Sequence, residues 1–394
     1  MRVCIVLHTD LFHPWPVLRP MREAEVLRSA GREVHVVSWI KDLAADWPAH
    51  EVRDGLEITR IKLAPPRGRW KRGAGYRAVM ERFAGEIVSL KPDVILCHDL
   101  EMLWASVMAK RELGVPLLYH AHENWPAMVS ERSFMEGLAF GFLERWLIRD
   151  VDHVYTVGEV LASRYRAWGK PVTVQYGSKS LAEMPRMTGA SIAARRAQRG
   201  FAPEDFVVGI AGSLGRDEAI PVILEALAAL PASTKLHVVG GLPERIASAR
   251  NIVSRLGLPD RVSFTGPLQT SAYLEDTALL DVGLAIFYPT SANQRFVVPL
   301  KLFDYMGLGV PAVVSDFPEM RRIAVETCHF GVAVSPRDPR AIRQAISDLA
   351  SNPHRRESMR NAAFACFEDT FAWERQREIL EASHPIFRAD QRPA

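Results

Sequence analysis

The sequence lacks the features that mark membrane-spanning, secreted and nucleic-acid-binding proteins. None of its apolar runs reaches the eighteen or so residues that a spanning helix needs, and the opening residues MRVCIVLHTD have the pattern of a strand. We therefore expect neither a signal peptide nor a spanning helix. A formal net charge of +3 on 394 residues is too small to indicate a nucleic-acid partner.

Cysteine is scarce, at four residues, and no two of them form a C-x-x-C pair. Cys4 and Cys97 lie inside strand-like apolar runs, and Cys328 and Cys366 are scattered further along the chain. We interpret all four as buried free thiols in a reducing compartment, which predicts a cytoplasmic location. A G-x-G-x-x-G motif is missing after the first predicted strand, which weakens an NAD-binding interpretation.

Apolar segments alternate with amphipathic helical segments along the chain, which predicts an α/β fold with parallel sheets. Its length suits two domains of about 180 to 200 residues each. Strands are predicted at residues 3–7, 34–39, 56–63, 94–97, 116–120, 153–156 and 172–175, and again at 206–212, 236–241, 261–266, 282–287, 311–316 and 331–335. We predict a first domain over residues 1–184, a linker over 185–200, a second domain over 201–372 and a last helix within 373–394.

The most informative stretch is PLKLFDYMGLGVPAVVSD, from Pro299 to Asp316, which predicts a short helix, a glycine turn and a buried strand. Lys301 and Asp304 are three positions apart and share one helical face near the N-terminus, where exposed N–H groups favour an anion. Lys301 would bind a phosphate there, and Asp304 would accept hydrogen bonds from two sugar hydroxyls such as those of a ribose. The alternative is a solvated ion pair between the two side chains.

This stretch resembles the nucleotide-sugar signature of glycosyltransferase family 4, in the subgroup whose helix reads P-x-K-L-F-E-Y-M. Asp304 stands where that subgroup has Glu, and Phe296 stands where many members carry a second Glu. The resemblance covers nearly the whole chain. It implies the GT-B architecture, with two Rossmann-like doubly wound domains facing across a cleft and a last helix that returns to the first domain.

The loop that opens the second domain, GIAGSLGRDEAIPVILEALAAL, places Gly212 and Gly215 between a strand and a helix. Pro221 belongs in the first helical turn, so the N-cap is predicted at Asp217 or just after it. A diphosphate would fit at this helix N-terminus, and the alternative is a plain strand-to-helix turn.

Members of the family commonly place two basic residues in and just after this loop to hold the phosphates. The resemblance gives one of these roles to Arg216, whereas Glu218 lies about where the second is expected. Either Arg216 and Lys301 suffice, or the site binds phosphate weakly.

Two segments of the first domain, CHDLEMLWAS and LLYHAHENWP, lie at the ends of predicted strands, where open α/β sheets bind ligands. His120 and His122 alternate along an extended segment and so point to the same side, with Glu123 directly after them. The resemblance makes His122 a contact to the donor sugar and Glu123 a polar residue near the reacting centre. The alternatives are a purely structural pair and a metal site. The second is disfavoured because no third spaced ligand is evident and the family needs no metal.

Two loops of the first domain suggest partners. The aromatic, proline-stiffened loop within His8–Glu25 suits stacking on an acceptor, or it packs on its own aromatics. The basic segment RGRWKRGAGYR, from Arg67 to Arg77, suggests peripheral contact with the inner face of an anionic membrane. The alternative is a solvated loop.

Together these features predict a glycosyltransferase that moves a sugar from a nucleoside diphosphate sugar to a hydroxyl acceptor, either a small molecule or a lipid-linked glycan. The resemblance implies retention of configuration, with Lys301 and Arg216 stabilising the leaving diphosphate and with no cofactor or metal. Phe296 and Glu218 motivate a second hypothesis, a catalytically weak GT-B subunit that binds nucleotide sugar and supports a partner enzyme. A third is a sugar-nucleotide epimerase of the same architecture.

Overall fold

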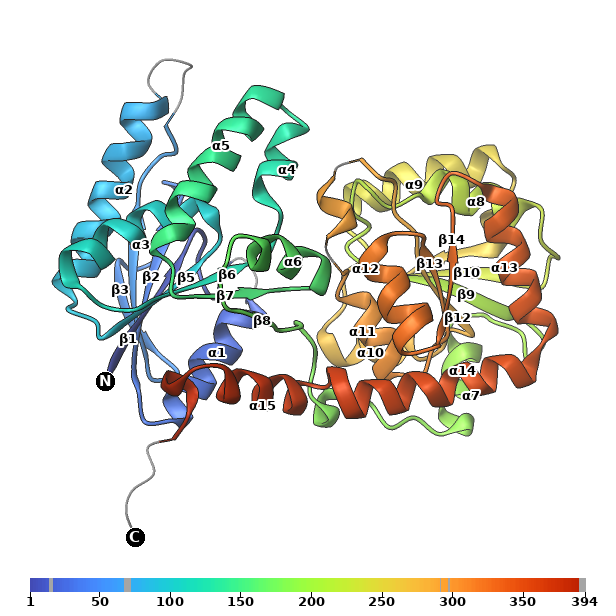
Figure 1. The fold of residues 1–394 in the computed structure, drawn as a ribbon. Helices are drawn as coiled ribbons and strands as arrows, with labels where there is room; N and C mark the ends of the chain where they lie inside the picture. The colour runs from blue at the N-terminus through green and yellow to red at the C-terminus, as the bar shows by residue number, and fades with distance from the viewer. Residues whose placement is uncertain (14–16, 67–71, 291, 297, 390–394) are drawn as a thin grey trace, which may run out of the picture. The chain divides into compact units, whose positions relative to one another are not determined.

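The computed structural model describes residues 1–13, 17–66, 72–290, 292–296 and 298–389, with no side-chain description for 72–74. The chain folds into two compact units. Unit 1 comprises Met1–Gly177 and Arg377–Ala394, and unit 2 comprises Ser178–Gln376. Each unit contains one sheet with helices on both of its faces (Figure 1).

The sheet of unit 1 has eight strands in the order β3-β4-β2-β1-β5-β6-β7-β8, which are parallel except for the β3–β4 pair. Its strands are β1 Arg2–Leu7, β2 Glu33–Ile40, β3 His50–Arg53, β4 Leu56–Lys62, β5 Val94–His98, β6 Leu117–Ala121, β7 His153–Thr156 and β8 Val172–Val174. Its helices are α1 Leu18–Ser29, α2 Arg72–Ser89, α3 Leu100–Leu113, α4 Trp125–Ser130, α5 Phe134–Leu147 and α6 Glu159–Ala167. Helix α1 lies on one side of the sheet, and α2 and α3 lie on the other (Figure 1).

The sheet of unit 2 has six parallel strands in the order β11-β10-β9-β12-β13-β14. These are β9 Phe206–Gly212, β10 Thr234–Gly240, β11 Val262–Phe264, β12 Val282–Ala285, β13 Ala312–Ser315 and β14 Gly331–Val334. The α-helices are α7 Gly189–Gln198, α8 Ile220–Ala228, α9 Pro243–Arg255, α10 Thr270–Thr277, α11 Lys301–Gly307, α12 Pro318–Arg321, α13 Pro339–Ser351 and α14 Pro353–Cys366. Helices α8 and α13 cover one face of the sheet, and α10 and α11 cover the other (Figure 1).

The predicted α/β architecture with two Rossmann-like parallel sheets is confirmed. Strand β3 was not predicted, because HEVR is polar and largely exposed at the sheet edge. The sequence does contain a hairpin signal, the dipeptide Asp54–Gly55. In the structure both residues have positive φ angles, 52° and 71°, as in a tight β-hairpin turn.

Two segments near the predicted boundaries show how the units are built. Helix α7, inside the predicted linker, is held to unit 2 because Arg195 and Arg199 both pair with the buried carboxylate of Asp276. The last helix, α15 (Trp373–Ser383), is followed by a segment that packs within unit 1. There the Arg32 guanidinium donates hydrogen bonds to the carbonyls of Ile386 and Arg388 at 3.1 and 2.8 Å.

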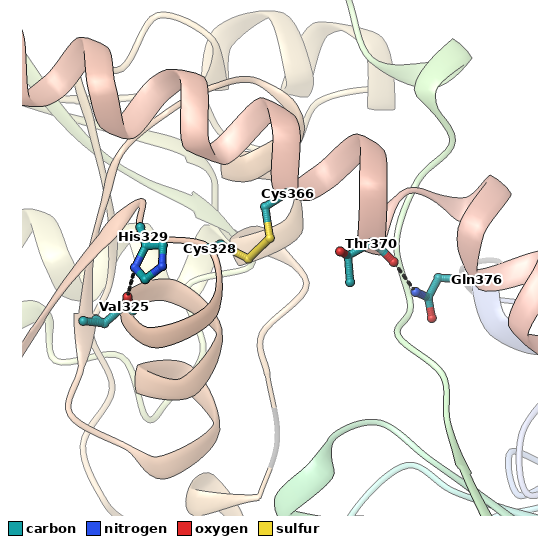
Figure 2. Close-up of a disulfide and its surroundings, with 6 residues drawn as sticks. All are labelled: Val325, Cys328, His329, Cys366, Thr370 and Gln376. Carbon is teal, nitrogen blue, oxygen red and sulfur yellow. Dashed lines mark hydrogen bonds between the residues drawn. A yellow bond between two sulfur atoms is a disulfide. The ribbon is translucent and has the colours of Figure 1, made fainter.

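The prediction of four free thiols is wrong for two of them, because Cys328 and Cys366 form a disulfide (Figure 2). Cys328 follows a π-helical turn, Cys366 ends α14, and their Cα atoms lie 5.4 Å apart. Packing of helices brings the two together, which their separation of 38 residues does not reveal. Cys4 and Cys97 are buried free thiols as predicted, and burial raises the pKa of both. Disulfides are rare in reducing compartments, so the cysteines as a set no longer favour a cytoplasmic location.

Over the described parts of the chain, no helix is both long enough and apolar enough to cross a bilayer.

Candidate functional site

The first candidate site is a cavity of about 480 Å³ in unit 2, beside helix α11. Lys301, Asp304, Gly212, Gly215 and Glu218 all line it, so four of the five residues predicted to bind the nucleotide lie together with the glutamate that departs from the family pattern. The fifth, Arg216, is exposed and is not among the residues that line this cavity.

Helix α11 is held against the sheet by Tyr305. The Tyr305 ring packs over Gly283 of β12, where an added Cβ would lie 2.6 Å from the ring. The Tyr305 hydroxyl accepts a hydrogen bond from the Ala211 N–H at 3.1 Å and lies 3.2 Å from the Leu284 carbonyl, to which it donates. These contacts fix the helix that carries Lys301 and Asp304.

Lys301 is buried and forms an ion pair with the carboxylate of Glu218. Its ammonium group also lies 5.1 Å from the centre of the Phe287 ring. Burial lowers the pKa of Lys301 to about 7, while the nearby charge of Asp304 acts in the opposite direction. The Glu218 carboxylate in direct contact further favours the charged ammonium, because opposite charges stabilise each other strongly when both are buried.

Asp304 is also buried, and its two oxygens have different partners. Oδ1 accepts from the Lys179 ammonium at 2.5 Å, and Oδ2 accepts from the Tyr273 hydroxyl at 3.0 Å. Lys301 and Asp304 therefore do not form the solvated ion pair that was the alternative interpretation. The cavity instead contains two separate lysine–carboxylate pairs.

The loop after β9 approaches these pairs closely. Gly212 has a φ of 112°, and a Cβ there would lie 3.5 Å from Lys301 Cε. Helix α8 begins at Ile220 with Pro221 in its first turn, as predicted, and its N-cap residue is Ala219. Asp217 instead accepts hydrogen bonds from Thr290 and Gln294.

The second candidate site is a cavity of about 380 Å³ in unit 1, lined by His122, Glu123, His98 and Asp99 among others. His98 ends β5 and pairs in register with His120 of the neighbouring strand β6. The carboxyl ends of parallel strands meet at one sheet edge, so the three histidines gather there. The rings of His120 and His122 lie 4.7 Å apart, as expected if they point to the same side.

A chain of close polar contacts runs behind His122. Arg19 Nη1 lies 2.9 Å from His122 Nδ1, and His122 Nε2 lies 2.9 Å from His98 Nδ1. His120 Nδ1 forms a hydrogen bond of 2.7 Å with Glu23 Oε1, while His98 Nε2 lies 3.0 Å from Glu23 Oε2 without hydrogen-bond geometry. We call Arg19, Glu23, His98, His120 and His122 the imidazole chain.

The partners determine where the protons of the imidazole chain sit. Because a guanidinium only donates, His122 Nδ1 must accept from Arg19, and His122 Nε2 therefore carries the proton. It donates to His98 Nδ1, so His98 carries its own proton on Nε2, which faces Glu23. Glu23 thus accepts a hydrogen bond from His120 and lies close to His98, which in turn contacts His122.

The charges in the imidazole chain follow from burial and pairing. Burial lowers the pKa of His122 well below its ordinary value, and the nearby Arg19 adds to this shift, so His122 is neutral near pH 7. Burial also lowers the pKa of His120 to about 4. Burial alone would raise the pKa of Glu23, but the adjacent imidazoles hold it well below its usual range. His120 and His122 are therefore uncharged near pH 7, and Glu23 is a buried carboxylate.

The structure supplies the third metal ligand that the sequence did not reveal. One ligand atom from each of His98, His120 and His122 lies within 4.8 Å of the others. That part of the case against a metal site is wrong, because strand pairing places His98 beside the other two. The Arg19 guanidinium, which contacts His122, still opposes a second cation at this place.

Reasoning from sequence missed several residues that now belong to the two sites. Glu23 and Lys179 are distant in sequence from the motifs they contact, and no local pattern identifies them. His98 had a signal, since the H-D-L segment ends the strand that neighbours H-A-H-E. Tyr273 lies on a separate helix and had none.

Comparison with known proteins agrees with this division into two units. A glycosyl transferase 4-like domain matches residues 18–176, and a glycosyl transferases group 1 domain matches residues 205–352. The chain belongs to the glycosyltransferases that combine these two domains.

Solved structures show the same fold. Sucrose-phosphate synthase from Thermosynechococcus elongatus is similar with a TM-score of 0.77 and 18% identity, over 97% of each chain. HepE from Anabaena, in complex with UDP-glucose, is similar with a TM-score of 0.69 and 16% identity, over 96% of this chain and 98% of that one. The fold of the chain is therefore GT-B.

A curated relative shares a shorter region. An exopolysaccharide phosphotransferase of Streptomyces coelicolor is 30% identical over 133 residues, which are 34% of this chain and 13% of that protein. The match thus spans a small part of the relative's length.

Proposed function

We propose that this glycosyltransferase moves a sugar from a nucleoside diphosphate sugar to a hydroxyl acceptor, with retention of configuration. The observation that carries the proposal is the unit 2 cavity, where Lys301 and Asp304 are buried together on a helix fixed by Tyr305. Lys301 has the charge to bind a phosphate, and Asp304 can accept hydrogen bonds from ribose hydroxyls. The similarity to proteins crystallised with UDP and UDP-glucose supports the same donor class.

In this proposal His122 contacts the donor sugar and Glu123 lies near the reacting centre. A neutral His122 with its Nδ1 occupied by Arg19 presents an oriented ring to the unit 1 cavity. Transition-state charge on the leaving diphosphate would be stabilised by Lys301. Arg216 is exposed and does not line the cavity, so it would contact the diphosphate only after its loop rearranges. Neither a metal nor a covalent cofactor has a role in the proposed reaction.

The experiment is a turnover assay on the purified chain, preceded by a thermal-stability screen with UDP, GDP, dTDP and CMP. A ligand at about 100 times its Kd adds roughly 2.7 kcal/mol of stability, which such a screen resolves. Stabilisation by a nucleoside diphosphate and formation of a glycoside with that donor are expected. Release of free nucleotide without a new glycoside would instead indicate an epimerase.

One observation favours a second candidate, a weakly catalytic subunit that binds nucleotide sugar and supports a partner enzyme. The Glu218 carboxylate forms an ion pair with the Lys301 ammonium through one oxygen. Its second oxygen, Oε2, is buried without a hydrogen-bond partner among the described residues. A donor phosphate must displace this carboxylate. Nucleotide binding without turnover on any hydroxyl acceptor would support this candidate.

The basic segment from Arg67 to Arg77 was predicted to contact a membrane, but residues 67–71 lie outside the described residues. Peripheral contact through that segment, and a cytoplasmic location, stay predictions.

A further inference from the structure

Helix α5 in unit 1 presents a row of large apolar side chains to solvent. Phe134, Leu138, Phe142 and Trp146 follow one another at intervals of four residues, so they lie along one face of the helix. With the adjacent Met135, we call them the apolar face of α5. Their exposed fractions are 68% for Phe134, 43% for Leu138, 74% for Phe142, 42% for Trp146 and 72% for Met135.

The opposite side of α5 is firmly packed, so the helix cannot rotate to bury this face. Glu144 is fully buried, and its carboxylate pairs with Arg164 at 2.5 Å and accepts from the Tyr165 hydroxyl at 2.6 Å. Leu147 is fully buried, and Gly137 packs against α4 so tightly that a Cβ would overlap Ser130. Within unit 1, therefore, no rotation of α5 can bury the apolar face.

The size of the apolar face fits either a lipid surface or a small protein interface. Because a large aromatic side chain buries about 150 to 250 Å², the five partly exposed side chains offer roughly 500 Å². A stable protein–protein interface takes about 800 Å² from each partner, of which a little over half is apolar, so a second copy of the chain is one outcome of the test below. A helix that lies in a lipid interface needs no such area, because its apolar side chains enter the acyl boundary directly.

The chemistry of the surrounding residues matches an anionic lipid surface. Arg145 and Arg149 are exposed near the end of α5 that carries Trp146. The Arg111 guanidinium lies 4.9 Å from the centre of the Trp146 ring and also pairs with Asp150. Two exposed carboxylates lie toward the other end, Glu136 in the first turn of α5 and Glu131 just before the helix. Aromatic side chains next to arginines are typical of segments that sit at the boundary between lipid and water.

We propose that the apolar face of α5 docks on a bilayer that contains anionic lipid. Helix α4 connects this face to the unit 1 cavity, because α4 packs against α5 and its Trp125 and Met128 line that cavity. Docking therefore brings a lipid surface near the cavity. Resting on the proposed function, this favours an acceptor hydroxyl carried by an amphiphile in the bilayer over a small soluble acceptor.

The test is co-sedimentation of the full chain with vesicles of phosphatidylcholine, with and without phosphatidylglycerol, in the absence of nucleotide. The unchanged chain should bind the vesicles that contain phosphatidylglycerol, and less so at high salt. Phe134→Ser combined with Phe142→Ser should weaken binding at least about ten-fold, which corresponds to about 1.4 kcal/mol. Arg145→Gln combined with Arg149→Gln should reduce binding only to the anionic vesicles.

A matched control replaces two exposed apolar residues elsewhere in unit 1, Leu43→Ser with Val52→Ser, whose exposed fractions are 58% and 75%. This control should bind vesicles like the unchanged chain. No binding by the unchanged chain, or an equal loss in the control, overturns the proposal. A dimer of the unchanged chain that dissociates in the Phe134→Ser, Phe142→Ser variant overturns it in favour of a second copy on this face.

Sugar transfer is tested separately. Vesicle binding is measured without donor, so a negative result leaves the proposed transferase activity intact. Conversely, the Phe134→Ser, Phe142→Ser variant should keep the nucleotide affinity of the unchanged chain, because neither residue belongs to unit 2.

Discussion

Glu218 is the residue that most distinguishes the unit 2 cavity. Its carboxylate pairs with Lys301, the lysine that is proposed to bind the donor phosphate. A donor phosphate and Glu218 are therefore competitors for one buried ammonium group. This competition makes the nucleotide affinity sensitive to substitutions on either side of the pair.

We predict that Lys301→Ala and Asp304→Ala each lower nucleotide affinity about ten-fold or more, because a charge-assisted hydrogen bond contributes roughly 1.5 to 3 kcal/mol. Glu218→Gln should raise the affinity, because the amide competes less strongly for Lys301. Titration calorimetry with the nucleotide that stabilises the chain best measures all three. If all three variants bind the nucleotide with the affinity of the unchanged chain, the nucleotide does not bind in this cavity.

The imidazole chain gives a second prediction about single residues. His122→Ala should lower kcat much more than nucleotide affinity, because the proposed contact is to the sugar. Glu23→Gln should also lower kcat and change its pH dependence, since an uncharged amide replaces the carboxylate that accepts from His120 and lies beside His98. The matched control is Glu25→Gln, two positions along α1 and exposed. Loss of activity with EDTA and recovery with zinc would contradict this assignment and favour a metal held by the three histidines.

His120 should make the stability of the fold depend on pH. Its pKa is about 4 in the folded chain and about 6.5 in the unfolded chain, so the unfolded state binds more protons between these values. The stabilisation is complete above pH 6.5 and is lost as the pH falls toward 4. We expect a loss of roughly 2 kcal/mol between about pH 7 and about pH 5 from this group. In urea unfolding, the His120→Asn variant should lose less stability between these two pH values than the unchanged chain. The control variant His50→Asn, at an exposed histidine, should lose as much stability as the unchanged chain.

Reasoning from sequence located residues within motifs but not their partners. Lys301 and Asp304 could be singled out because one helical turn separates them. Glu218 was noticed only as a departure from the family pattern, and its pairing with a lysine 83 residues away depends on the packing of α11 beside the β9 loop. Glu23 gave no signal, since a glutamate on an amphipathic helix is ordinarily exposed.

At the scale of elements, apolar strands were predicted well because buried parallel strands are short, continuous apolar runs. Strand β7 and strand β9 have the predicted bounds. Polar or edge elements such as β3 were missed. The disulfide was missed because it depends on how α14 packs, which a spacing of cysteines does not encode.

Helix α11 illustrates how an element positions a site, and this can be tested with two glycines. Gly283→Ala places a Cβ 2.6 Å from the Tyr305 ring and should destabilise the chain by about 1 to 3 kcal/mol, because the ring must shift. Because α11 carries Lys301 and Asp304, the same substitution should also lower the affinity for the nucleotide. Gly85→Ala, in helix α2 with nothing within 4 Å of its added Cβ, should instead stabilise by about 0.5 to 1 kcal/mol. Denaturant unfolding and nucleotide titration of both variants provide the comparison.

At the scale of the whole molecule, the proposed roles fall on different units. The residues proposed to bind the nucleotide, Lys301 and Asp304, belong to unit 2, and the imidazole chain belongs to unit 1. The two-domain organisation was predictable from chain length and from two series of strands. The cavities were not, because each depends on side chains that meet only after the sheet has formed.

This division predicts where a nucleotide without its sugar protects the backbone from hydrogen exchange. Saturating nucleoside diphosphate should slow exchange in α11 and in the loop after β9, because ligand binding stabilises the elements that it contacts. Peptides that contain His98 and His122 should exchange at the same rate with and without this ligand. Lys301→Ala serves as the control, since protection at the same ligand concentration should fall in that variant. Protection centred on His122 with the sugar-free nucleotide would assign the nucleotide to unit 1 and contradict the proposed donor site.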